Sequence, residues 1–286
     1  MLRIFILVVL SVGLSSCKNS PKTVLVVGDS WAFLSCLYKS LDQALMKAGV
    51  TDAGVNKDCA LTSIVGAEVS DWLTTSQHEQ TLQALKDPSV KVVYISLGGN
   101  DVMNTWNKDM TPLQLDNLVM DLKTNLNKIL EIYRTARPDV RFLVSGYDYP
   151  RFTLNHPIPE YAEAFANMGF PEPSEINRAL IIMSEKFLGL SEASNTAYLH
   201  HLGLMHYHFG HIEAGLQPKT TKPPALISKP GETLNTHGGV SGLSTDASAM
   251  ETFLDGQVVD AFHLSKLGYL FMAEHTVEQY LKDWLK

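Results

Sequence analysis

Short, predominantly apolar runs alternate along this chain with longer segments of helical periodicity. Apolar runs occupy residues 23–27, 90–97 and 140–146, and a further short strand is expected near residues 60–65. Helical spacing covers residues 34–48, 69–85, 112–136, 174–190 and 264–284. A strand that is apolar at every position is buried on both faces, which is typical of a parallel sheet covered by helices. We therefore predict an α/β chain, a three-layer α/β/α sandwich around a central parallel sheet.

The composition fits a globular chain and excludes one class of partner. The 286 residues are 45% hydrophobic and 19% charged, so the chain can bury a full core. The formal net charge is −7, and no run of Lys and Arg exceeds two residues. Such a chain lacks the basic surface that a phosphate backbone requires. We expect no nucleic-acid partner, and the sequence leaves the oligomeric state open.

The first seventeen residues are expected to be an export signal. Arg3 precedes an apolar run over residues 4–10, far shorter than the roughly 20 residues of a membrane-spanning helix. The following Leu14-Ser15-Ser16-Cys17 resembles the lipobox of bacterial lipoproteins, in which the Cys carries the lipid. We expect an exported protein that a multiply acylated Cys17 anchors to the cell envelope. Lys18 resembles the sorting pattern of outer-membrane lipoproteins that face the periplasm; an ordinary signal peptide with a chance Cys is the alternative.

Two further cysteines, Cys36 and Cys59, remain if Cys17 is lipidated. Exported proteins fold in an oxidising compartment, where disulfides persist. A Cys36–Cys59 disulfide requires that the fold bring the two Cα atoms within about 7 Å of each other. Two buried free thiols are the alternative, because Cys also serves as a small core residue.

Residues that can carry chemistry follow the predicted strands. Open parallel sheets bind ligands at the carboxyl ends of their strands, so these positions are examined first. A further segment, near the C-terminus, stands immediately before the final predicted helix. The segments are GDSW at residues 28–31, Gly66 with Ala67, GGND at 98–101 and DAFH at 260–263.

The side chains of these segments can form one catalytic arrangement. A serine hydroxyl becomes a nucleophile when a base removes its proton, and histidine is the side chain best suited to that role near neutral pH. Asp260, three residues before His263, can accept the Nδ1 proton and leave Nε2 facing Ser30. The alternatives are structural, since Asp-Ser before a helix is often an N-cap and Asn-Asp after a strand is often a turn.

The four segments, in this order and at these strand ends, resemble the signature blocks of the SGNH, or GDSL-like, serine hydrolases. The resemblance implies a flavodoxin-like α/β/α fold with Ser30 as nucleophile, His263 as base and Asp260 as its acidic partner. It also implies an oxyanion hole made by the backbone N–H groups of Ser30 and Gly66 and the side-chain amide of Asn100. The second block is poorer in glycine than is common, so another amide in place of Gly66 stays open. The chain has no G-x-S-x-G, which argues against the α/β-hydrolase fold.

The expected function is hydrolysis of a carboxylic ester through a serine acyl-enzyme, without a metal or an organic cofactor. Members of the family act on lipids, small esters, thioesters and acetylated sugars, so the substrate is a small-molecule, lipid or acylated-carbohydrate ester. Residues 18–286 are expected to form a single domain, with specificity in insertions near residues 151–173 and 215–242. Acyl transfer to a sugar or lipid alcohol is one alternative. A catalytically silent envelope-binding lipoprotein is another.

A second cluster of candidate residues is the histidine-rich segment HHLGLMHYHFGH at residues 200–211. If the segment formed a strand, His206 and His208 would share one face, as paired metal ligands do. It contains no carboxylate before Glu213. A polar strand end or pocket wall is therefore the preferred interpretation, and metal binding is the alternative.

Overall fold

The computed structural model describes residues 22–74, 76–224, 229–253 and 256–286, and its centre is a five-stranded sheet. The predicted export signal and Cys17 lie outside these residues. The strand order is β2-β1-β3-β4-β5, and every pairing is parallel, so all carboxyl ends lie at one edge. The strands are β1 (Lys22–Gly28), β2 (Ala53–Val55), β3 (Val90–Ser96), β4 (Arg141–Ser145) and β5 (Thr196–Leu199).

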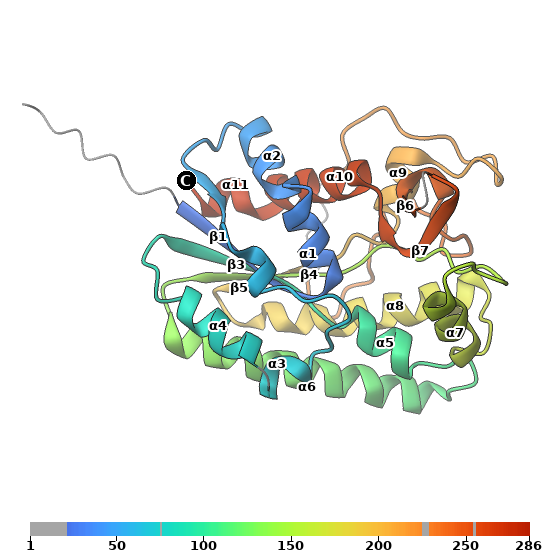
Figure 1. The fold of residues 1–286 in the computed structure, drawn as a ribbon, viewed down its shortest axis with the longest axis horizontal. Helices are drawn as coiled ribbons and strands as arrows, with labels where there is room; N and C mark the ends of the chain where they lie inside the picture. The colour runs from blue at the N-terminus through green and yellow to red at the C-terminus, as the bar shows by residue number, and fades with distance from the viewer. Residues whose placement is uncertain (1–21, 75, 225–228, 254–255) are drawn as a thin grey trace, which may run out of the picture.

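Helices cover both faces of the sheet, as Figure 1 shows, which confirms the predicted three-layer α/β/α sandwich. One layer holds α1 (Ser30–Leu37), α2 (Ser40–Lys47), α10 (Lys266–Thr276), a π-helical turn η4 (Val277–Leu281) and α11 (Lys282–Trp284). The other holds α3 (Asp71–Thr74), α4 (Ser76–Ala84), α5 (Gly99–Thr105), α6 (Pro112–Ala136) and α8 (Pro173–Phe187). At the carboxyl end of the sheet lie α7 (Pro159–Asn167), α9 (Leu204–Phe209) and the antiparallel hairpin of β6 (Met250–Phe253) and β7 (Val258–Leu264).

The hydrophobic core is divided by the sheet into two parts. Side chains of a strand alternate between its faces. Leu25 and Val27 of β1 belong to the larger apolar cluster, against α6 and α8, whereas Val24 and Val26 belong to the cluster against α2 and the C-terminal helices. All four are fully buried. This burial on both faces is why residues 24–27 of the strand are all apolar.

Helix α6 spans residues 112–136, as predicted, and the residues at its N-terminus are typical of a helix start. Thr111 is the N-cap and forms a capping box with Gln114, in which each side chain bonds the other residue's backbone. Pro112 occupies the first turn, where a missing N–H costs nothing.

The second strand lies earlier in the chain than predicted. The structure has β2 at Ala53–Val55, whereas Cys59–Leu61 form the 3₁₀ turn η1 and only Ser63 makes a bridge to Gly28. The prediction of a strand at residues 60–65 is therefore wrong. An edge strand of three residues is too short for its pattern to be recognised, while tertiary contacts hold residues 59–65 in irregular backbone.

The structure joins Cys36 and Cys59 in a disulfide, with their Cα atoms 6.3 Å apart. Cys36 lies in the last turn of α1 and Cys59 at the start of η1. The bond connects the helix that begins at Ser30 with the segment that leads to Gly66.

The two predicted insertions differ in structure. Residues 151–173 contain α7, whereas the described parts of residues 215–242 contain no helix or strand. Within the ranges that the structure describes, no helix combines the length and apolarity needed to span a membrane.

Candidate active site

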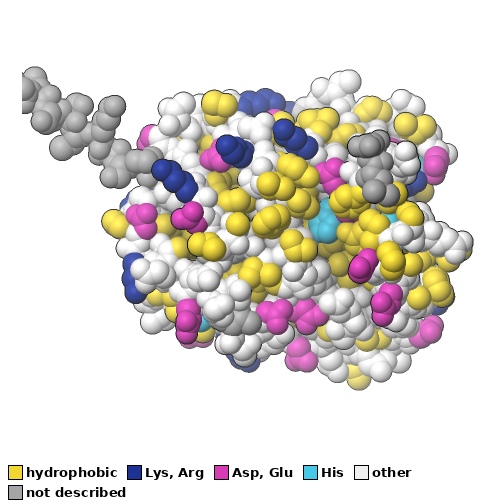
Figure 2. All heavy atoms as spheres, in the orientation of Figure 1, with side chains coloured by type: hydrophobic (Ala, Val, Ile, Leu, Met, Phe, Trp, Pro, Cys, Tyr) yellow, Lys and Arg dark blue, Asp and Glu magenta, His cyan; other side chains and the backbone are white. Residues whose placement is uncertain are grey.

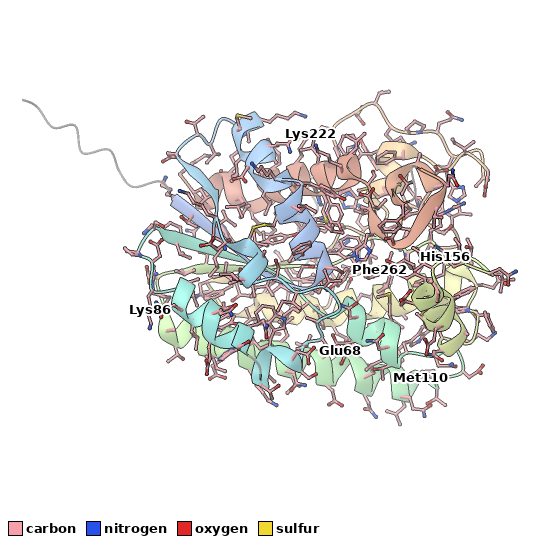
Figure 3. All side chains as sticks on the ribbon, viewed as in Figure 1. Glu68, Lys86, Met110, His156, Lys222 and Phe262 are labelled. Carbon is pink, nitrogen blue, oxygen red and sulfur yellow. A yellow bond between two sulfur atoms is a disulfide. The ribbon has the colours of Figure 1, made fainter. Side chains whose placement is uncertain are left out.

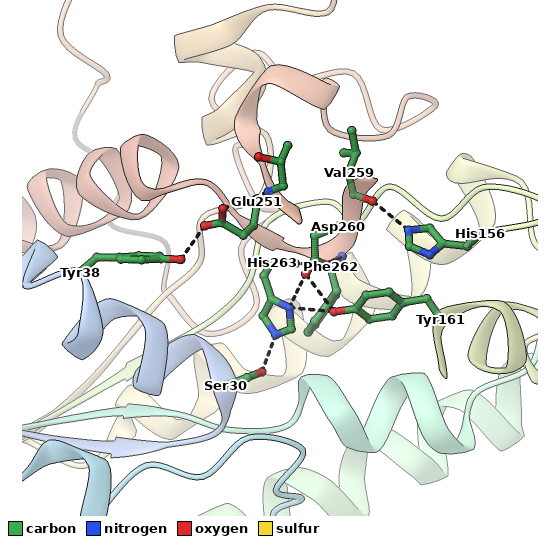
Figure 4. Close-up of polar contacts among 10 residues, drawn as sticks. Ser30, Tyr38, His156, Tyr161, Glu251, Val259, Asp260, Phe262 and His263 are labelled. Carbon is green, nitrogen blue, oxygen red and sulfur yellow. Dashed lines mark hydrogen bonds and ion pairs between the residues drawn. The ribbon is translucent and has the colours of Figure 1, made fainter. Parts of the chain in front are cut away.

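Ser30, Asp260 and His263 meet at the carboxyl edge of the sheet. Ser30 Oγ lies 2.7 Å from His263 Nε2, and His263 Nδ1 lies 2.9 Å from Asp260 Oδ2 (Figure 4). A carboxylate only accepts hydrogen bonds, so Nδ1 carries the proton and Nε2 is left to accept one from the serine. The arrangement is that of an activated serine nucleophile.

The turn between β1 and α1 places Ser30. Gly28 has a φ of +142°, and a Cβ at this position would collide with the carbonyl oxygen of Ser96 on β3, so the turn requires glycine. Asp29 caps α1 through its Oδ1, which accepts from Trp31 N at 2.9 Å. The N-cap is therefore Asp29, and Ser30 is the first helical residue, with its N–H at the unpaired, positive end of the helix.

Asp29 has a structural role in this turn. Its side chain is fully buried, and its Oδ2 accepts from the Tyr147 hydroxyl at 2.5 Å. Burial raises the pKa of Asp29 to about 6, although hydrogen bonds from Tyr147 and Trp31 oppose the rise. These contacts show that Asp29 orders the loop that carries Ser30.

Asp260 and His263 come from a bulge in the β6–β7 hairpin. Met250 pairs with Leu264 and Thr252 pairs with Val259, so the four residues 260–263 of β7 face the single residue Glu251 of β6. The backbone curls so that the N–H groups of Phe262 and His263 donate to Asp260 Oδ1 at 2.6 and 2.7 Å. This curl, rather than a helical turn, brings the carboxylate against the His263 ring.

Hydrogen bonds attach the β6–β7 hairpin to α1 on one side and to residues 151–156 on the other. On one side Glu251 Oε2 accepts from the hydroxyl of Tyr38, at the end of α1, at 2.6 Å. On the other, Arg151 N donates to Ala261 O at 2.7 Å, and His156 Nε2 donates to Val259 O at 2.8 Å. Figure 3 shows His156 at the same end of the molecule as Phe262 of β7. These contacts hold the histidine of the hairpin against the helix that carries Ser30.

The Asp260 carboxylate is charged although it is buried. Burial alone would raise its pKa, but the hydrogen bonds and charge of His263 and the backbone N–H groups outweigh this, so the pKa of Asp260 lies below its ordinary value. A charged carboxylate at this position stabilises the imidazolium that forms when His263 takes a proton.

The second and third sequence blocks lie beside Ser30. Ile64 N donates to Gly28 O at 2.7 Å, which places the turn containing Gly66, with a φ of +79°, next to the serine turn. Asn100 lies in the first turn of α5 and donates from Nδ2 to Ala67 O at 2.9 Å. An amide nitrogen has two N–H groups, so the second is available to a substrate oxygen.

Tyr161 of α7 is a site residue that the sequence did not indicate. Its hydroxyl lies 3.0 Å from Asp260 Oδ2 and 2.9 Å from His263 Nδ1 (Figure 4). The only signal was its place in residues 151–173, where specificity was expected. A contact across about a hundred positions leaves no local pattern.

A family model for the GDSL-like lipases and acylhydrolases matches residues 24–276. The chain belongs to this family. This family comprises lipases and acylhydrolases, so the chain is an ester-hydrolysing enzyme. A search of curated proteins found no match.

Several solved structures are similar to this GDSL-like hydrolase. An extracellular lipase from Streptomyces rimosus is 15% identical, with a TM-score of 0.50 over 90% of this chain and 99% of that chain. A member of the lipolytic G-D-S-L family from Veillonella parvula is 10% identical, with a TM-score of 0.46 over 91% and 99%. A family 3 carbohydrate esterase from Talaromyces cellulolyticus is 12% identical, with a TM-score of 0.44 over 92% and 97%.

Residues 204–209 of the histidine-rich segment form a helix, α9, in this GDSL-like hydrolase, so His206 and His208 do not share a strand face. His206 uses both ring nitrogens, since Nε2 donates to Ser244 O and Nδ1 accepts from Val240 N. The His208 ring stacks on Phe271. Across the described ranges, no group of three or more His, Cys, Asp or Glu is arranged to hold a metal ion.

Four other histidines form a buried cluster between α10 and the end of β5. The ring centroid of His275 lies 4.6 Å from that of His237 and 5.4 Å from that of His201, and His200 lies 5.7 Å from His237. Burial lowers the pKa of His200 to about 4, of His275 to about 3 and of His237 to about 2, and holds the pKa of His201 well below its ordinary value.

This cluster predicts acid sensitivity. An unfolded histidine has a pKa of about 6.5, so below that pH the unfolded chain binds protons that the folded cluster does not. The free energy of unfolding keeps its full value above about pH 6.5, and it falls as the pH drops toward the pKa values of the histidines in the folded protein. We expect His275→Gln to remove about 2 kcal/mol of the destabilisation at pH 5. Melting temperatures measured between pH 7.5 and 5 give the dependence of stability on pH. This dependence should be weaker in His275→Gln than in wild type.

The matched control is His78→Gln on α4, outside the cluster. That variant should keep the wild-type dependence of melting temperature on pH. An equal slope in His275→Gln and wild type would contradict the prediction.

Proposed function

We propose that this enzyme hydrolyses a carboxylic ester through a covalent acyl-enzyme on Ser30. The observation that carries the proposal is the 2.7 Å contact between Ser30 Oγ and His263 Nε2, with Asp260 behind the ring. His263 takes the serine proton as Oγ bonds the carbonyl carbon, and then donates it to the departing alcohol oxygen. The same ring then removes a proton from water as the water attacks the acyl-enzyme, and it returns that proton to Ser30 Oγ as the acid leaves.

The developing oxyanion would be bound by the N–H groups of Ser30 and Gly66 and by the amide of Asn100. The helix start at Ser30 adds the positive end of a helix dipole. Donors fixed before the reaction stabilise the transition state without reorganising, and each contributes roughly 3 to 4 kcal/mol. The positions of the second and third blocks beside the serine turn support this assignment.

An apolar acyl group suits the surroundings of the site. Figure 2 shows a histidine surrounded by hydrophobic side chains on the face between α1 and the β6–β7 hairpin. Val65, next to Gly66, is 63% exposed, and Phe253 at the end of β6 is 39% exposed. Val65 adjoins the proposed oxyanion hole, so its exposed side chain suits an apolar acyl chain.

The direct test is labelling with a fluorophosphonate, which reacts with activated serines. We expect one adduct, located on Ser30 by peptide mass spectrometry, and none in Ser30→Ala. A series of p-nitrophenyl esters of increasing acyl length then defines the substrate. Wild-type protein that stays unlabelled would reject the proposal.

Asn100→Ala is expected to lower kcat by about a hundredfold with little change in KM, because the lost bond to the substrate forms in the transition state. The variant also loses the bond to Ala67 O, which should cost about 1 kcal/mol of folding stability. Steady-state kinetics and melting temperature are measured together.

Asn195→Ala is the matched control, since Asn195 Nδ2 likewise donates to a backbone carbonyl, that of Val140, at 3.1 Å, away from the site. Asn195→Ala should lose a similar amount of folding stability but keep the wild-type kcat. A destabilised Asn100→Ala with normal kcat would show that Asn100 is only a turn residue.

We further propose that the enzyme is exported and held on the outer membrane, facing the periplasm, by lipid on Cys17. The lipobox and the Cys36–Cys59 disulfide support this, because disulfides persist in oxidising compartments. Cys17→Ser is expected to leave the protein unlipidated and soluble in the periplasm. Fractionation and metabolic labelling with a fatty acid measure the outcome, and a variant that stays in the membrane fraction would refute the anchor.

A further inference from the structure

The hydroxyl of Tyr161 lies against both members of the Asp260–His263 pair. It is 3.0 Å from Asp260 Oδ2 and 2.9 Å from His263 Nδ1, and these two atoms are themselves 2.9 Å apart. A phenol has one proton, and a carboxylate oxygen only accepts. The hydroxyl therefore donates to Asp260 and presents its lone pairs to the Nδ1–H of the ring.

Tyr161 completes the hydrogen bonding of the carboxylate. Oδ1 accepts the backbone N–H groups of Phe262 and His263, and Oδ2 accepts Nδ1–H and the phenol. A carboxylate has about four acceptor sites, and the Asp260 side chain is fully buried. Rotation of the carboxylate would break at least one of these bonds, so its plane is fixed, and with it the direction of the His263 ring.

The tyrosine is itself held in place. His156 donates from Nε2 to Val259 O, accepts Ile158 N–H at Nδ1 at 3.1 Å, and packs edge-on against the Tyr161 ring at 5.1 Å. Val259 directly precedes Asp260. The start of α7 is therefore bound to the strand that carries the carboxylate.

The hydroxyl also keeps its proton. Burial and the neighbouring Asp260 charge hold the pKa of Tyr161 above its ordinary value. It is a permanent donor to Asp260 over the range in which a histidine base works.

We propose that Tyr161 is a positioning residue that fixes the Asp260 carboxylate and, through it, the His263 base. The orientation of the base is then set by α7, within residues 151–173, as well as by the hairpin. This inference rests on the proposed acyl-enzyme mechanism.

The test is a double-mutant cycle between Tyr161→Phe and Asp260→Asn. We expect Tyr161→Phe to lower kcat about tenfold and leave KM unchanged, because one bond to a charged group is lost. In the Asp260→Asn background the same change should cost less than about twofold, because the hydroxyl acts through the carboxylate. Losses that multiply would show an independent role and overturn the proposal.

Tyr198→Phe is the matched control. It removes a buried phenol hydroxyl that donates to Ser184 at 2.8 Å, between β5 and α8. We expect this variant to keep wild-type kcat even if its melting temperature falls. A similar kcat loss in both variants would mean that Tyr161 acts only through stability.

Fluorophosphonate labelling separates the two proposals. We expect Ser30 to be labelled in both proteins, about tenfold more slowly in Tyr161→Phe. No labelling of the wild-type protein would reject the acyl-enzyme mechanism. Labelling of wild type and Tyr161→Phe at equal rates, with equal kcat, would reject only the role of Tyr161.

Discussion

Ser30→Ala is expected to abolish turnover of p-nitrophenyl acetate while the protein stays folded. The substitution removes one oxygen atom, whose hydrogen-bond partner in the structure is His263 Nε2. Alanine is well tolerated in the first turn of a helix, so α1 should keep its start. Without the nucleophile no acyl-enzyme forms, and the loss in kcat should exceed roughly 10⁴-fold. Steady-state kinetics and a thermal melt measure the two effects.

The chain offers a matched control on the same helix. Ser35 is buried in α1 and its hydroxyl has no hydrogen-bond partner among the described residues. Ser35→Ala should therefore keep both activity and stability. Wild-type hydrolysis by Ser30→Ala would rule out this serine as the nucleophile.

His263→Ala is expected to lose at least about 10⁴-fold in kcat, and Asp260→Asn to lose less. Removing His263 leaves no base for the serine proton and no acid for the leaving group. An Asn at position 260 can keep the backbone bonds of Phe262 and His263 to its oxygen. Its amide nitrogen then faces Nδ1, where it favours the ring tautomer with a proton on Nε2.

The Asp260→Asn enzyme should thus work through the minority of rings that still present a free Nε2. Measuring kcat of both variants, with circular dichroism to verify folding, gives the order of the losses. An equal or larger loss in Asp260→Asn would contradict the assigned roles.

Much of the sheet follows from local sequence, and the exceptions have physical causes. The strands β1, β3 and β4 have mainly apolar central residues because helices cover both faces, so their runs are recognisable. The strands β2 and β5 are three and four residues long and take their strand conformation from pairing with neighbours. Residues 204–209 are helical, whereas the sequence also allowed a strand there, because the period of a short apolar-polar alternation does not distinguish a strand from one and a half turns of helix.

The site divides in the same way. Ser30 and Asn100 follow strands, and Asp260 and His263 stand before the last helix, so sequence order was enough to nominate them. Gly66 was nominated at the end of a strand that the structure replaces with irregular backbone. The backbone curl that brings Asp260 to His263 forms where the β6–β7 pairing is interrupted at Glu251. No sequence pattern marks this interruption. Tyr161 reaches them only because His156 bonds Val259 across 103 positions. Such contacts arise from the assembled fold.

The Cys36–Cys59 disulfide also bears on how copies of this protein behave toward one another. Sheet edges present unpaired N–H and C=O groups on which a strand of another chain can add. The loop closed by the disulfide contains β2, which covers the longer strand β1. One end of the loop continues from α1 at Cys36, and the disulfide joins the other end, Cys59, to the same helix. The disulfide therefore keeps β2 paired with β1. In the oxidised protein residues 22–24 of β1 are therefore kept from pairing with another chain, and reducing conditions would weaken this protection.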